Sequence, residues 1–130
     1  MIREPIPVVV EQHAQEAVTL RNTRSFLVRA PHVRLNQLRR LDDRLAAHLD
    51  GLSIAGEQGS KLVVAALESP GPGEIFTATA RAIEERDAAG LERSLVLVQA
   101  LPELQAGLVS AFAWVSTSSL RGIAKVLLEV

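Results

Sequence analysis

The three histidines are the side chains of this sequence that could most readily bind a metal ion or move a proton. They are His13, His32 and His48, and no two of them have the spacing with which one helix presents two imidazoles to zinc. A metal site would have to be assembled from three separate segments, with carboxylates as added ligands. We therefore predict no metal site and no cofactor.

Groups that could act in acid–base or nucleophilic catalysis are no better arranged. Asp42 and Asp43 are adjacent, so on a helix they point about 100° apart and do not converge on one substrate. The serines lack the Gly-x-Ser-x-Gly pattern of a nucleophile elbow. The glycine-rich residues 71–73 lack the Lys-Ser/Thr ending of a phosphate-binding loop. We predict that the protein is not an enzyme.

Structural roles suit the histidines better. His32 follows Pro31 and is expected to fix the turn between the first two helices through a backbone hydrogen bond. His48 lies beside an apolar row of the second helix, and Gly51 is expected to mark the end of that helix. We assign Pro31, His32, His48 and Gly51 to the turns that shape the fold.

Arginines are concentrated between residues 21 and 44, where seven of them accompany only two acidic residues. Residues 51–103 carry the opposite balance, with four basic and eight acidic side chains. Such a run is commonly just a solvated helix face, yet arginine binds carboxylates or phosphates in a bidentate manner and is enriched in protein interfaces. The residues predicted to contact an acidic partner protein are Arg21, Arg24, Arg34, Arg39, Arg40 and Arg44.

Nucleic acid is an alternative partner for the arginine-rich segment 21–44. The whole chain, however, has 14 basic and 15 acidic residues and a net charge of −1, so it lacks the overall positive charge typical of nucleic-acid-binding proteins. Phe26 is the only aromatic residue near these arginines, which leaves no platform for base stacking. A helical nucleic-acid-binding domain is therefore the less supported alternative.

The elements that must position these residues are predicted to be helices. Apolar residues recur every three or four positions, as on one face of a helix. Prolines and glycines divide the first part of the chain into helices at about 8–29, 34–51 and 58–68. The clearest pattern is a leucine row in the second of these helices: Leu35, Leu38, Leu41, Leu45, Leu49 and Leu52.

Residues 69–73, with the sequence Ser-Pro-Gly-Pro-Gly, cannot continue a helix. We place a domain boundary there, between residues 1–69 and residues 70–130. Four helices are predicted after it. Asp87 is expected to cap the second of them, and Thr117 or Ser118 the fourth.

The interval from Asp87 to Ser118 has the length and pattern of a helical repeat. Phe112 and Trp114 lie in a nearly uncharged stretch, where core packing is expected, and the alternative is a helix face that contacts a further repeat or another protein. The sequence stops at residues 127–130 without a polar capping helix, so we expect the repeats to continue in a longer protein.

The remaining composition bears on cellular location. The sequence has no cysteine, which excludes disulfides and thiolate chemistry. No apolar stretch reaches the roughly 20 residues that span a bilayer, and the start lacks the layout of a signal peptide. We expect a cytoplasmic protein without a membrane partner.

Several segments together resemble a known family. Ala30-Pro31-His32 is followed by the leucine row, by residues 42–52 and by Ala55-Gly56, and residues 72–76 and 107–111 also match. From about Ile6 onward, the sequence resembles the N-terminal part of an uncharacterised family of bacterial HEAT-repeat-like proteins. Genes of this family often lie beside those for type VI secretion.

The resemblance implies an all-α fold of antiparallel helical hairpins. Residues 1–69 would form an N-terminal helical cap, and residues 70–130 would begin a HEAT-like right-handed solenoid. It also implies a non-catalytic protein-binding scaffold, such as an accessory, adaptor or chaperone for a type VI effector. An immunity protein that neutralises a secreted toxin is the alternative. Self-association through the exposed C-terminal repeat end is a further expectation.

Overall fold

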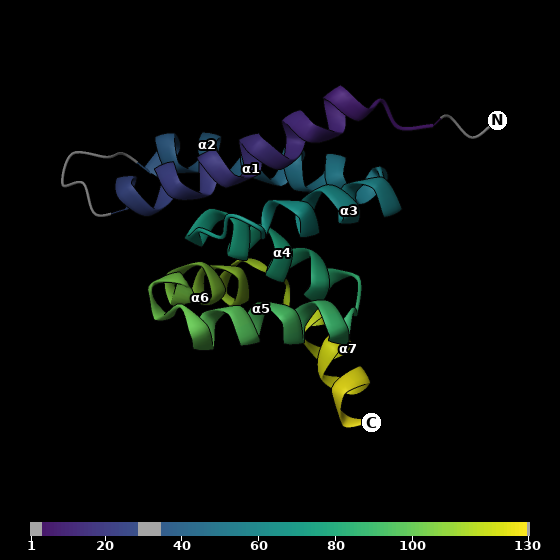
Figure 1. Cartoon of the computed structure of the whole chain (residues 1–130). Helices are drawn as coiled ribbons and strands as arrows, with labels where there is room; N and C mark the ends of the chain where they lie inside the picture. Colours follow the sequence, from purple (N-terminus) through teal and green to yellow (C-terminus); the bar gives the residue numbers. More distant parts are fainter. Residues whose placement is uncertain (1–3, 29–34, 130) are drawn as a thin grey trace. The chain divides into compact units, whose positions relative to one another are not determined.

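All regular secondary structure is helical in the computed structural model, which describes residues 4–28 and 35–129 (Figure 1). The predicted all-α class is thereby confirmed. Two compact units divide the chain, residues 1–65 (unit 1) and residues 66–130 (unit 2). None of the helices in the described part of the chain is both long and apolar enough to cross a membrane.

Each unit has its own set of helices. Those of unit 1 are α1 (Pro7–Leu27), α2 (Leu35–Ile54) and α3 (Glu57–Ala66), whose last residue already belongs to unit 2. Those of unit 2 are α4 (Pro72–Glu84), α5 (Ala88–Ala100), a 3-10 turn (Pro102–Leu104), α6 (Gln105–Trp114) and α7 (Thr117–Leu128). Pro31, His32 and Arg34 lie outside the described residues, so their predicted roles stay predictions.

In unit 1, α1 and α2 pack along each other as an antiparallel hairpin (Figure 1). α1 begins at Pro7, whose missing N–H falls in the first turn, where no helical hydrogen bond is required. The buried apolar side chains of α1 are Val10, Ala17 and Leu20. Three buried apolar residues are few for a helix of 21 residues. The second half of α1 is mostly polar, so it contributes little to apolar packing.

The leucine row of α2 supplies the other side of the hairpin. Leu41, Leu45, Leu49 and Leu52 are buried, and Leu38 is partly buried. The predicted end of this helix at residue 51 is wrong, because α2 continues to Ile54 and Gly51 lies inside it. A glycine within a helix costs about 1 kcal/mol relative to alanine, and the burial of Leu52 one residue later offsets that cost.

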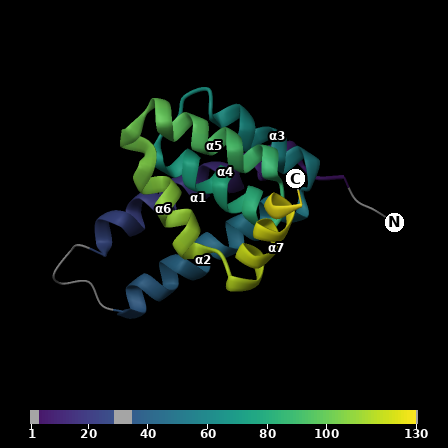
Figure 2. The ribbon, with the colours of Figure 1, turned by 90° about the horizontal axis from the view of Figure 1, so that it is seen from below.

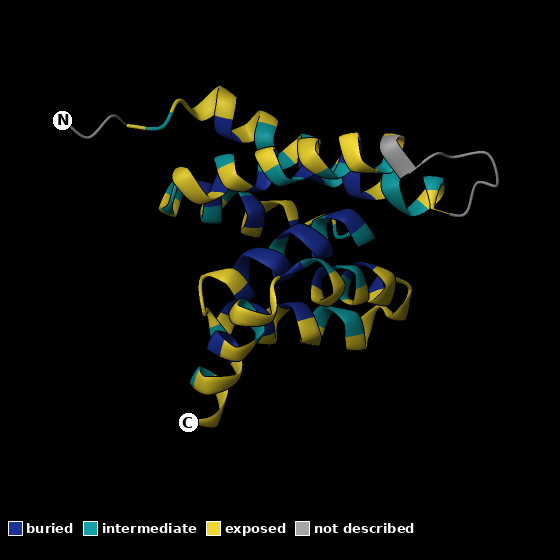
Figure 3. Cartoon of the chain, turned by 180° about the vertical axis from the view of Figure 1, so that it is seen from behind, coloured by how far each residue is buried: buried dark blue, intermediate teal, exposed yellow. Residues whose placement is uncertain are grey.

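Unit 2 is organised around α4. This helix contacts α5, α6 and α7 (Figure 2), and buried residues are concentrated along it (Figure 3). Among its fully buried side chains are Ile75, Phe76 and Ile83. Phe76 meets Trp114 of α6 edge to face, with ring centroids 6.1 Å apart. Core packing is thus the role of Trp114, whereas Phe112 is more exposed.

Side-chain caps begin two of the helices in unit 2. The Asp87 carboxylate accepts a hydrogen bond of 3.0 Å from the Gly90 backbone N–H at the start of α5, as predicted. At the start of α7 the cap is Ser116, which accepts from the Ser119 N–H at 3.1 Å. The prediction of Thr117 or Ser118 as the cap is therefore wrong by one or two residues, because both residues already lie within α7.

The later helices of unit 2 do not form a simple succession of pairs. α6 packs against α4 and α5, while α7 contacts α4 and α5. In a regular stack of hairpins α7 would pair chiefly with α6. The coarse all-helical arrangement is clear, and the HEAT-like geometry stays a prediction.

Candidate functional site

A pair of histidines joins the two long helices of unit 1. His13 of α1 and His48 of α2 face each other with their Nδ1 atoms 2.9 Å apart. The ring centroids are 5.1 Å apart and the ring planes are inclined by 55°. This distance is that of a hydrogen bond, so one Nδ1 must carry a hydrogen and the other must accept it.

Gly51 creates the space in which the His13 ring lies. A Cβ atom at residue 51 would overlap with Cδ2, Nε2 and Cγ of that ring. The Nδ1 edge of His13 therefore faces His48, while its opposite edge lies against the backbone of α2 at Gly51. The residue assigned to a turn from the sequence is instead the one that admits the imidazole.

The electrostatic surroundings of His48 disfavour its charged form. Partial burial lowers the pKa of His48, and the nearby His13 and Arg44 lower it further. Glu16 on α1 acts in the opposite direction. The result is a pKa below the ordinary histidine value of 6.5.

A pocket of about 310 Å³ adjoins the histidine pair at the end of the hairpin. His13 and Gly51 line it, with Glu4 on the chain that leads into α1. Its remaining walls come mainly from the first turn of α1 and the last turn of α2: Ile6, Val9, Val10, Ile54 and Ala55. Within the described ranges, no group of three or more histidine, cysteine, aspartate or glutamate side chains could hold a metal ion.

Two of the predicted partner-binding arginines are engaged within the protein. Arg21 is buried, with 6% of its surface exposed, and its Nη1 donates to Asn22 Oδ1 at 3.0 Å. Burial lowers the pKa of Arg21. Arg24 Nε donates to Asp42 Oδ1 of α2 at 2.6 Å, in an ion pair whose side chains are 39% and 31% exposed. Such a half-exposed pair contributes up to about 1 kcal/mol.

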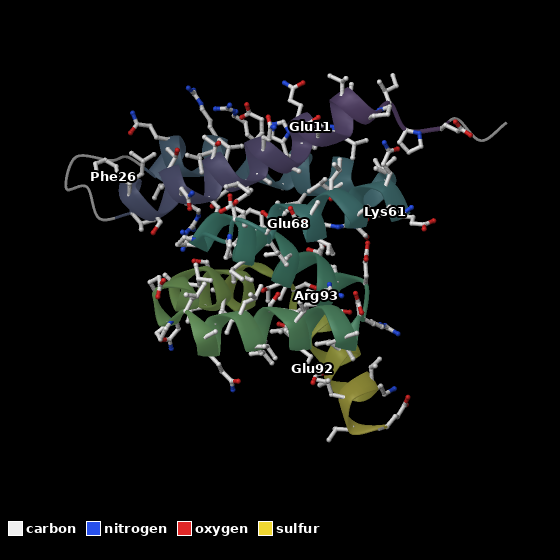
Figure 4. All side chains as sticks on the ribbon, viewed as in Figure 1. Glu11, Phe26, Lys61, Glu68, Glu92 and Arg93 are labelled. Atoms are coloured by element: carbon white, nitrogen blue, oxygen red, sulfur yellow. The ribbon has the colours of Figure 1, made fainter. Side chains whose placement is uncertain are left out.

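The other described arginines of this set remain on the surface. Arg39, Arg40 and Arg44 are all exposed on α2. Phe26, the aromatic residue near the cluster, is 74% exposed close to the end of α1 (Figure 4). Three arginines of one helix are thus exposed within the described residues.

Several large apolar side chains of unit 2 are exposed. Five large apolar side chains of α5, the following turn and α6 are exposed: Leu95, Val96, Leu101, Val109 and Phe112. Charged side chains such as Glu92 and Arg93 lie on the same helix α5 (Figure 4).

Sequence analysis missed the histidine pair although a signal was present. His13 and His48 are equally far along the chain from the Ala30–Pro31 bond, where the turn was expected. In an antiparallel hairpin, residues equidistant from the turn lie opposite each other. Helical periodicity shows which residues share a face of one helix, but not which residues of the other helix lie opposite that face. Predicting the pair therefore also required the distance of each histidine from the turn.

Compared with protein-family models, curated proteins and solved structures, the chain matches none of them.

Proposed function

We propose that this chain is a non-catalytic, protein-binding helical scaffold in which Arg39, Arg40 and Arg44 contact an acidic surface of the partner. The observation that carries this proposal is the exposure of these three arginines on one helix. A helix fixes the backbone of all three, so little backbone freedom is lost on binding. Guanidinium groups pair with carboxylates through two parallel hydrogen bonds. Such a contact is both strong and restricted to one relative orientation of the two groups.

The finer architecture that we propose is HEAT-like. Supporting observations are the contacts of α4 with both α5 and α6, which would correspond to one hairpin and the first helix of the next. A following repeat would cover the exposed apolar side chains of α5 and α6. Self-association is proposed at the C-terminal repeat end, where Leu127 and Leu128 of α7 are exposed.

The family resemblance supplies the proposed setting, which is type VI secretion in the bacterial cytoplasm. There the chain would act as an accessory, adaptor or chaperone of a secreted effector. An immunity protein could use the same arginines, but its partner would be a toxin that is silenced in the complex. The activity of the captured partner, free and bound, separates these two roles.

The test is co-purification with the product of a neighbouring gene, followed by a binding titration. We expect a stoichiometric complex that Arg39→Glu combined with Arg40→Glu weakens at least about tenfold, because two attractive contacts become repulsive. Arg93→Glu combined with Arg121→Glu is the matched control, since both residues are exposed arginines of unit 2. An equal loss of affinity in both double variants, or none in the first, would remove the α2 arginines from the proposal.

Nucleic acid would bind the same exposed arginines through phosphate contacts. Affinity for an oligonucleotide should then fall steeply as salt is added. We expect no retardation of single- or double-stranded oligonucleotides even at low salt, because the net charge is −1 and aromatic residues are scarce. Salt-sensitive retardation that the Arg39→Glu, Arg40→Glu variant abolishes would favour nucleic acid over protein.

A further inference from the structure

The attachment of α1 to α2 depends on few apolar side chains. Those of α1 that are buried are Val10, Ala17 and Leu20, in a helix of 21 residues. Polar contacts between the two helices include the Arg24–Asp42 ion pair and the His13–His48 hydrogen bond. Because the apolar contribution is small, a change in either polar contact has a large relative effect on the hairpin.

The hydrogen bond between the two Nδ1 atoms can accommodate one added proton but not two. In the neutral pair one ring donates its Nδ1 hydrogen and the other accepts it. A first proton can add to Nε2 of the donor ring, which keeps the bond and makes it charge-assisted. A second proton must add to the accepting Nδ1. That step removes the only acceptor and places two cations side by side.

We infer that the His13–His48 pair is a two-proton switch that releases α1 from α2 when both imidazoles become charged. The inference is independent of the proposed partner, since it concerns the hairpin alone. The His13 ring occupies the space above Gly51. Displacing the ring from His48 therefore also disturbs its contact with Gly51 of α2.

Charged groups on both helices set the balance of the switch. Arg44 of α2 opposes a charge on His48, whereas Glu16 of α1 favours it. Glu4 lies beside the pocket that His13 lines.

The direction of the pH effect follows from the lowered pKa of His48. A released or unfolded hairpin binds more protons than the closed hairpin once the pH falls below the ordinary value of 6.5. The stability contributed by neutral His48 is thus fully present above that pH and is lost progressively as the pH falls below it.

Spin labels can measure the opening directly, because the chain contains no cysteine. Gln12→Cys on α1 and Ala47→Cys on α2 place labels at exposed positions. Electron–electron distance distributions would be recorded from about pH 7.5 to about pH 5, with helical content followed by circular dichroism. We expect the population with the longer interhelical distance to grow about tenfold over this range.

Glutamine variants separate the switch from general acid effects. In His48→Gln or His13→Gln the amide can still form a hydrogen bond but does not titrate. We expect each variant to keep the short distance at low pH, whereas His32→Gln should open as the unsubstituted chain does. A constant distance in the unsubstituted chain, or opening that persists in either the His13 or the His48 variant, would overturn the inference.

Discussion

Gly107 of α6 lies directly against the carbonyl oxygen of Pro72 in the first turn of α4. A Cβ atom at residue 107 would overlap with that oxygen and with other backbone atoms of Pro72. The missing side chain therefore allows α6 to approach the backbone of α4 within unit 2. Both residues lie in the segments 72–76 and 107–111, whose proximity sequence analysis did not predict.

We predict that Gly107→Ala destabilises unit 2 by about 3 kcal/mol, since backbone atoms cannot move aside as a flexible side chain can. Trp114, the only tryptophan, packs against Phe76 in the same unit, so its fluorescence during urea unfolding measures this loss. Ala106→Ser at the neighbouring exposed position is the control and should cost no more than about 0.5 kcal/mol. Equal midpoints for the two variants would contradict the close approach of α6 and α4.

The effect of Gly51→Ala on the stability of the hairpin should have opposite signs with and without the His13 side chain. Alone, the substitution displaces the His13 ring and weakens the α1–α2 hairpin despite the better helix propensity of alanine. In a His13→Ala background, the same change should stabilise by up to about 1 kcal/mol. Amide hydrogen exchange of α1 and α2 measures both effects. Stabilisation by Gly51→Ala in the original sequence would show that the ring does not occupy this space.

Asp87→Ala should destabilise α5 by about 1 kcal/mol, because the Gly90 N–H loses its side-chain acceptor. The Asp87→Asn variant retains an acceptor at the same position and should lose much less stability. Thermal unfolding followed by circular dichroism compares the two. The cap would be unimportant if alanine and asparagine gave the same midpoint as aspartate.

A double-mutant cycle on Arg24 and Asp42 should give a coupling energy of at most about 1 kcal/mol, reduced further by salt. Urea unfolding of Arg24→Ala, Asp42→Ala and the double variant provides the measurement. The same pairing implies that Arg24→Glu affects partner binding less than Arg39→Glu does, since Arg24 already contacts a carboxylate. A larger binding loss for Arg24→Glu would place it at the interface instead.

Periodicity and helix-breaking residues predicted the helical class and the main segments correctly. The leucine row of α2 is largely buried, and the Pro-Gly segment separates α3 from α4. These features are local, because the spacing of three or four residues and the conformational limits of proline act within one element. The predicted bounds of α1 and α3 differ from the observed ones by only one or two residues.

Contacts between elements were harder to predict. Arg21 was expected to face a partner but is buried, while Gly51 was expected to end α2 but lies beneath His13. Both outcomes depend on which residues of a neighbouring helix contact these positions. The periodic pattern of one helix does not identify those residues. The histidine pair could have been predicted only from the equal distances of His13 and His48 from the expected turn of the hairpin.

Arg86 follows α4 with a φ of 57°, in the left-handed region that glycine would adopt at lower energy. Its side chain lies over Gly122 of α7, so that a Cβ atom there would meet the guanidinium group. A glycine at residue 86 would relax the backbone but would remove the side chain that covers Gly122 of α7. The one left-handed residue at the junction of α4 and α5 thus also supplies the side chain that packs on Gly122 of α7, so a substitution at residue 86 would alter the backbone of that junction and its contact with α7 together.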